Sequence, residues 1–148
     1  MITDLDRHFL QVAIDEATRG MDEGGIPIGS ALRRGEQLVA AGHNQRVQRG
    51  DPMAHAEIAC LTNAGRQPTY RDTVLYSTLS PCALCSGAVV QFGIPRVVVG
   101  EDETFRGPVE WLLANGVVVE VVDSIQCKEL LRLFIRQHPA IWHEDIGI

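Results

Sequence analysis

The sequence predicts an α/β fold in which a mixed sheet of five strands lies between helices, as a three-layer α/β/α sandwich. Two observations support this. Segments with apolar residues at helical spacing alternate with short segments rich in β-branched residues. The first two strand segments are joined by a short turn, whereas helices separate the later ones, so antiparallel and parallel neighbours are both expected. No repeat, low-complexity segment or linker interrupts this pattern, which predicts a single domain over residues 1–148.

The N-terminal segment predicts a helix over residues 5–21. Asp4 or Asp6 can cap its start, and Gly24 with Gly25 can end it. The apolar residues at helical spacing are Phe9, Val12, Ala13, Ile14, Ala17 and Met21. This pattern predicts one face buried against the sheet.

A β-hairpin and a short helix are expected next. The strands cover residues 26–32 and 37–41, with a turn at Arg34-Gly35. Residues 54–64 follow as a short helix, which Gly65 closes.

The second half of the chain alternates strands and helices. Ser80-Pro81 introduces a helix that Gly93 can close, Ser124 can cap the last helix, and Pro139 stops it. The expected elements are strands at 73–78, 96–99 and 117–122, helices at 82–92 and 124–137, and an acidic-aromatic tail at 142–148. The helix-linked strands are the candidates for parallel pairing.

The composition favours a cytoplasmic protein with a small substrate. Hydrophobic residues make up 45% of the chain, but the longest apolar runs are far too short to span a bilayer, and no signal peptide is evident. The net charge is -6, and the 13 basic residues are scattered. Proteins that bind duplexes or tRNA usually have a basic face, so nucleic acid is a disfavoured partner and a small neutral molecule a better one.

Two short motifs predict a zinc site. The first is His55-Ala56-Glu57, and the second is Pro81-Cys82-Ala83-Leu84-Cys85. Zinc binds imidazole and thiolate readily, and a C-x-x-C pair at a helix start places two sulfurs within reach of one ion. The helix N-terminus also favours the thiolate form. His55, Cys82 and Cys85 are therefore the expected ligands of one Zn²⁺ per chain.

The expected site is catalytic. Three protein ligands with no fourth of comparable spacing leave an open coordination position, which is typical of catalytic zinc. Glu57 can approach the same ion from the first turn of its helix, as a proton shuttle for a zinc-activated water. The combination H-x-E with P-C-x-x-C is found in zinc nucleobase deaminases. Cys60 and Cys127 lie in expected helices and are interpreted as small buried hydrophobic residues.

Longer segments resemble the small zinc-dependent cytosine deaminases of fungi, within the cytidine deaminase superfamily, nearly from end to end. The matching segments are EGGIPIG at 23–29, GHNQR at 42–46, HAEI at 55–58, LYSTLSPCALC at 75–85, FGIPRVVVGE at 92–101 and WHEDIG at 142–147. HAEI and PCxxC are common to all branches, whereas the tail with its tryptophan is more specific to enzymes that act on free bases. The resemblance implies a cytidine deaminase-like fold, a homodimer and a role in pyrimidine salvage.

The resemblance also implies roles for individual residues. Asn44 would hydrogen-bond the pyrimidine edge, and Asp145 would accept a hydrogen bond from a base N–H. Phe105 and Trp142 would stack on or cover the ring. The other residues that the resemblance places at the substrate are Ile26, Ala56, Leu79, Ser80 and His143.

Three positions depart from the fungal pattern. Ala56 stands where the pattern has glycine, His143 replaces an aromatic residue, and the segment after Phe105 reads Arg106-Gly107-Pro108. These changes leave the zinc motifs intact and bear on which substrate is accepted, because His143 and Arg106 lie near the expected lid.

The predicted reaction is hydrolytic deamination of a free nucleobase, most simply cytosine to uracil and ammonia. Three alternatives remain open. One is another amino-heterocycle, such as isocytosine, a creatinine-like ring or guanine. The second is a tRNA adenosine deaminase, which shares both motifs but suits the acidic balance and the aromatic tail less well. The third is a zinc-stabilised binding module without catalysis, for which Glu57 would have no purpose.

Overall fold

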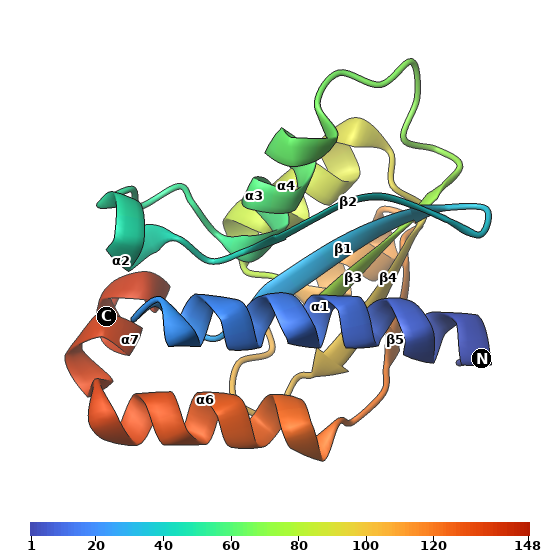
Figure 1. Cartoon of the computed structure of the whole chain (residues 1–148). Coiled ribbons are helices and arrows are strands. Elements are labelled where there is room, and N and C mark those ends of the chain that lie inside the picture. Colours follow the sequence, from blue (N-terminus) through green and yellow to red (C-terminus); the bar gives the residue numbers. More distant parts are fainter.

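The computed structural model describes residues 1–148 and confirms the α/β/α architecture (Figure 1). One sheet has the strand order β2-β1-β3-β4-β5. The strands are β1 (Gly29–Arg34), β2 (Gln37–His43), β3 (Thr73–Leu79), β4 (Arg96–Glu101) and β5 (Val118–Val121). The helices are α1 (Asp4–Asp22), α2 (Arg46–Arg49), α3 (Ala56–Ala64), α4 (Ala83–Phe92), α5 (Val109–Ala114), α6 (Ile125–Gln137) and α7 (Pro139–Ile146).

The sheet is mixed, as the connections predict. β1 pairs antiparallel with β2 and with β3. β3 with β4, and β4 with β5, are parallel pairs connected through α4 and α5. Crossover helices return the chain to the same end of the sheet, so the carboxyl ends of β3 and β4 lie together.

The two faces of the sheet bury different side chains because successive strand residues point to opposite sides. Leu32, Leu75 and Val97 belong to a core with residues of α3, α4 and α5. Ala31 and Val98, one position away, belong to a second core with residues of α1 and α6. Figure 1 shows α1 and α6 on one side of the sheet and α3 and α4 on the other.

Helix α1 begins differently from the expectation. Thr3, rather than Asp4 or Asp6, is its N-cap, and it accepts a hydrogen bond from the backbone N–H of Asp6. The Asp6 side chain accepts one from the backbone N–H of Thr3, which completes a capping box. The caps expected at Ser124 and Gly93 are both present.

The C-terminal segment is the main difference from the expected elements. Pro139 stops α6, as predicted, but it also starts α7, so most of the expected tail is helical. Proline is suited to the first turn of a helix, because the backbone N–H groups there have no acceptor within the helix, so the N–H that proline lacks is not needed. Helix α7 brings Trp142 into a core cluster with Ile26, Leu79 and Phe134.

A buried ion pair connects α1 to the sheet. The Asp6 side chain is fully buried, and its oxygens lie 2.8 Å from Nη1 and 2.8 Å from Nη2 of Arg96 on β4. Tyr76 also donates a hydrogen bond of 2.7 Å to Asp6. The hydrogen bonds with Arg96 hold the pKa of Asp6 well below its usual range.

We expect Asp6→Asn to lower the free energy of unfolding at pH 7 by roughly 3 kcal/mol, because it leaves the Arg96 guanidinium without its buried partner. A carboxyl group whose pKa is lower in the folded state than in the unfolded state stabilises the fold fully when the pH is above its unfolded-state pKa, here 3.8. As the pH falls below 3.8, this contribution is progressively lost. Urea unfolding should therefore show a smaller difference between variant and wild type at pH 3. An equal difference at both pH values would contradict this. Asp72→Asn is the control, since it breaks an exposed pair with Arg34.

None of the helices combines the length and the apolarity needed to cross a lipid bilayer.

Candidate metal centre and substrate cavity

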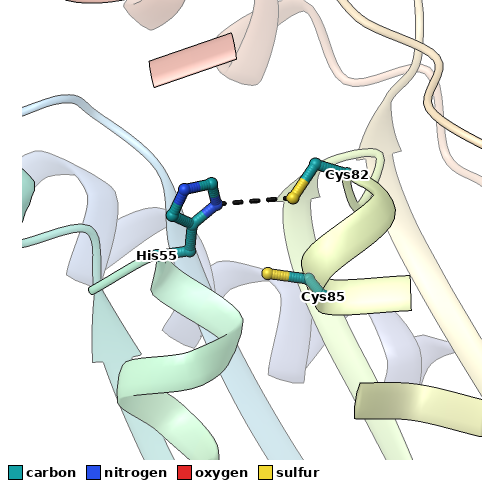
Figure 2. A group of neighbouring side chains, drawn as sticks. All are labelled: His55, Cys82 and Cys85. Carbon is teal, nitrogen blue, oxygen red and sulfur yellow. Dashed lines mark hydrogen bonds between the residues drawn. The ribbon is translucent and has the colours of Figure 1, made fainter. Parts of the chain in front are cut away.

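The N-termini of α3 and α4 meet and bring the two sequence motifs together. His55 is the N-cap of α3 and Cys82 is the N-cap of α4, both with extended backbone angles. Neither side chain caps its own helix, so both are free to point into the space between the helices. Cys85 lies in the first turn of α4 and is fully buried. Figure 2 shows His55 on one side of this space and the two sulfurs on the other.

The three side chains fit a zinc ion. Their ligand atoms all lie within 4.8 Å of one another, and Nδ1 of His55 lies 3.5 Å from Sγ of Cys82. In a tetrahedral site with usual zinc–nitrogen and zinc–sulfur bond lengths, the nitrogen and sulfur are about 3.5 Å apart. One imidazole and two sulfurs are ligand types that zinc takes in deaminases. The structure therefore supports His55, Cys82 and Cys85 as one set of ligands.

Of the three groups, only Cys82 is held in the protonation state that binds a metal, so zinc binding would release protons from His55 and Cys85. Hydrogen bonds from Cys85 and then from His55 lower the pKa of Cys82 to about 4. The hydrogen bond with Cys82 raises the pKa of His55 to about 9. The hydrogen bond between Cys82 and Cys85, together with burial, raises the pKa of Cys85. Cys82 is thus a thiolate at neutral pH, which is the form that binds metals.

Glu57 is a buried carboxyl beside the metal ligands. It lies in the first turn of α3 and is 4% exposed. Ser77 of β3 donates a hydrogen bond to its Oε1. Burial raises the pKa of Glu57. Inside a helix, side chains two positions apart point in different directions. His55 and Glu57 can both reach the site because the backbone of His55 is extended and not helical.

A small cavity adjoins these residues. Its volume is about 20 Å³, which is enough for one water molecule. The lining residues are Ile28, Asn44, His55, Ala56, Glu57, Leu79, Ser80, Cys82, Phe105, Trp142, Asp145 and Ile146. Most residues predicted for the site thus meet at one place.

Two residues that were predicted to contact the substrate do not line this cavity. Ile26 is fully buried, but it packs in the core cluster beneath Ala56, Leu79 and Trp142. His143 is exposed, because the helical period of α7 turns Trp142, Asp145 and Ile146 inward and His143 outward. The geometry of α7 thus places His143 outside the cavity, and its role near the substrate stays a prediction.

The structure adds residues that sequence reasoning missed. Ile28 and Ile146 line the cavity, and Ser77 bonds Glu57. Ile146 lies one position after Asp145, and a helical reading of 139–146 would have placed it with Trp142. Ser77 could be found only from the register of β3.

Hydrogen bonds across the cavity connect α7 to the corner after β2. Asn44 is 1% exposed, and its Nδ2 donates to Oδ1 of Asp145 over 3.4 Å. The Asn44 Oδ1 accepts from the backbone N–H of Arg46 at 3.0 Å, so the amide nitrogen is the atom turned toward the cavity. Oδ1 of Asp145 also lies 3.6 Å from Nε2 of His55. Burial raises the pKa of Asp145.

A larger groove lies elsewhere on the surface. Its volume is about 920 Å³, and it runs between α3, α4 and the segment 65–71. It contains none of the metal ligands, and two of its lining residues on α4, Leu84 and Phe92, are exposed. Size alone therefore does not identify the reactive site in this molecule.

Comparisons with known proteins agree with this geometry. Residues 3–101 match the family described as "Cytidine and deoxycytidylate deaminase zinc-binding region". A cytosine deaminase of Candida albicans is 44% identical over 145 residues, covering 96% of this chain and 97% of that protein. A tRNA-specific adenosine deaminase of Buchnera aphidicola is 37% identical over 103 residues, covering 68% of each chain. A solved guanine deaminase from Nitrosomonas europaea shares the fold, with a TM-score of 0.73 at 22% identity, covering 90% of this chain and 85% of that one.

The chain belongs to the cytidine and deoxycytidylate deaminase family. Both motifs of the metal site, from His55 to Cys85, lie within the matched region. The protein is therefore a zinc-dependent deaminase.

Proposed function

We propose that this protein hydrolyses free cytosine to uracil and ammonia. One observation carries the proposal: the buried Glu57 carboxyl, the metal ligands His55 and Cys82, Asn44 and Asp145 all line one small cavity, and the third metal ligand, Cys85, lies beside the other two. The likeness to the Candida albicans cytosine deaminase over nearly the whole of both chains supports it.

His55, Cys82 and Cys85 would hold the zinc ion. When bound there, zinc would acidify a water molecule and so supply a nucleophile at neutral pH. Glu57 moves the protons. Ser77 donates a hydrogen bond to its Oε1, and the carboxylate would take the proton of the attacking water. Glu57 then delivers this proton to the ring nitrogen next to the reacting carbon. It next takes the remaining proton from the new hydroxyl on that carbon and passes it to the amine, which departs as ammonia while the hydroxyl becomes the carbonyl.

Asn44 and Asp145 form a donor and an acceptor that match cytosine. The Asn44 amide can donate to a carbonyl, and the Asp145 carboxylate can accept from an N–H. In cytosine, the carbon that bears the amine is followed by a bare ring nitrogen, a carbonyl and an N–H. In isocytosine, the atom that follows the bare nitrogen and the carbonyl is a C–H, which leaves Asp145 without a donor. An unpaired buried carboxylate is costly, so the pair favours cytosine.

Apolar side chains complete the proposed substrate site. Phe105 and Trp142 would cover the two sides of the ring, with Leu79, Ala56 and Ile146 around it. A pyrimidine is much larger than a cavity of about 20 Å³, so α7 or the segment of Phe105 must move to admit it. The Ser80 hydroxyl donates a hydrogen bond to the carbonyl of Arg106. This bond connects the residues just before α4 to the loop that carries Phe105.

The test is ammonia release from zinc-loaded protein with cytosine, isocytosine, cytidine, guanine and adenine compared side by side. We expect turnover of cytosine. Cytidine should be inert, because its ribose takes the place of the N–H hydrogen that would form the hydrogen bond to Asp145. Turnover of isocytosine or guanine in place of cytosine would overturn the assigned base and keep the reaction class. Inosine formation in tRNA without turnover of any free base would replace the proposal with the tRNA activity of the more distant relative.

A homodimer, a cytoplasmic location and a role in pyrimidine salvage belong to the same proposal. The location rests on the composition of the chain, and the dimer and the salvage role rest on the family resemblance. The groove between α3 and α4, with the exposed Leu84 and Phe92 among its lining residues, is a suitable face for a second copy. Sedimentation equilibrium should give twice the chain mass of 16.2 kDa. A mass of one chain at micromolar concentration would contradict the dimer.

A further inference from the structure

A buried histidine that the proposed reaction does not use lies directly before Asn44. His43 is the last residue of β2 and is 8% exposed. Its Nδ1 lies 2.7 Å from Oε2 of Glu16, and its Nε2 lies 2.8 Å from Oε1 of Glu23. Both ring nitrogens therefore contact a carboxylate, so the imidazole is held from two sides.

The surroundings hold the imidazole in this place. Its ring lies against Gly20 of α1, where a Cβ would come within 3.0 Å of His43 Cδ2. Arg19 pairs with the other oxygen of Glu16 at 3.0 Å and so orients that carboxylate. The His43 ring therefore joins the C-terminal half of α1 to the end of β2.

A second connection leads from the same cluster to Asn44. The Gln48 Nε2 lies 3.2 Å from Oε1 of Glu23, the oxygen that also faces His43. The same Nε2 lies 3.3 Å from the backbone carbonyl of Asn44. Asn44 is thus held through its peptide bond to His43 and through its carbonyl by Gln48.

We propose that the cluster of Glu16, His43, Glu23 and Gln48 positions Asn44 for recognition of the base, with His43 as its centre. None of the four lines the cavity, so they act through Asn44 and do not touch the substrate. The inference rests on the proposed function only in assigning base recognition to Asn44. The contacts themselves are independent of the substrate.

Three variants test the cluster. His43→Gln keeps at most one of the two contacts to carboxylates. Gln48→Met removes the amide that reaches Asn44, and its partly exposed position makes it the milder change for folding. Thr3→Ala is the matched control, because it removes the N-cap at the opposite end of the same helix and destabilises α1 without approaching the cavity.

For cytosine, we expect His43→Gln and Gln48→Met to raise KM roughly tenfold while kcat stays within about twofold, because a displaced Asn44 weakens binding of the ground state and of the transition state alike. Thr3→Ala should lower Tm and leave KM unchanged. A KM unchanged in both cluster variants, or a loss confined to kcat, would overturn the proposal. If His43→Gln fails to fold, Gln48→Met decides alone.

A readout without turnover separates this proposal from the proposed function. The side-chain amide of Asn44 can be followed by ¹H–¹⁵N NMR and identified by its loss in Asn44→Ala. We expect its resonances to shift or broaden in both cluster variants and to remain unchanged in Thr3→Ala. Wild-type protein that turns over no base would refute the proposed function alone. Asn44 resonances unchanged in both cluster variants would refute the positioning role alone.

Discussion

Replacing Glu57 with glutamine is expected to lower the turnover of cytosine about 10²–10⁴-fold while zinc remains bound. Glutamine has nearly the same shape and can still accept the hydrogen bond of Ser77, but it cannot take up a proton. The metal ligands are unchanged, so the loss isolates proton transfer from metal binding.

Two measurements check this expectation together. The zinc content should stay near one ion per chain, and steady-state kinetics should show the loss in kcat. Glu129→Gln is the control, since it removes the same charge from an exposed position of α6, and it should behave as wild type. A Glu57→Gln protein with bound zinc and near-normal turnover would remove Glu57 from the mechanism.

Replacing Cys85 with alanine should abolish zinc binding and, with it, all activity. A catalytic zinc site usually has three protein ligands, and Cys85 is one of the three that meet here. Its side chain is fully buried, so no other cysteine can take its place. The variant should also have a lower Tm than the zinc-loaded wild type, because a metal that binds only the folded state stabilises it.

Cys127→Ala provides the matched control for this change. Cys127 is also a buried free cysteine, but it lies on α6 in the core cluster against β4 and α1. Burial raises the pKa of its thiol to about 11, so it stays protonated and does not compete for the metal. Metal analysis should find about one zinc ion in Cys127→Ala and none in Cys85→Ala. Zinc retained by Cys85→Ala would contradict the assigned set of ligands.

Local signals account for what was predicted well about the fold. The apolar spacing over α1, the turn at Gly35 and the caps at Gly93 and Ser124 are set by neighbours in the sequence, and the structure confirms each of them. Pro139 was interpreted only as a stop, although proline is equally suited to start a helix. The helix after it was therefore missed.

Contacts between distant segments account for the rest. Ser77 of β3 meets Glu57 of α3 across 20 positions of the chain, and Asp6 meets Arg96 across 90. No local pattern encodes such pairs, since each depends on the register and order of the strands.

By itself, the sequence determined the α/β layering and the metal motifs and predicted Glu57 as the proton shuttle, because these depend on spacings of a few residues and on the chemistry of imidazole, thiolate and carboxylate. Only the tertiary structure decided which C-terminal residues face the cavity. Helix α7 is held by contacts such as Asn44 with Asp145 and Arg46 with Glu144, 101 and 98 positions apart. The helical turn that these contacts orient brings Asp145 to the site and leaves His143 in solvent, because side chains two positions apart on a helix point in different directions.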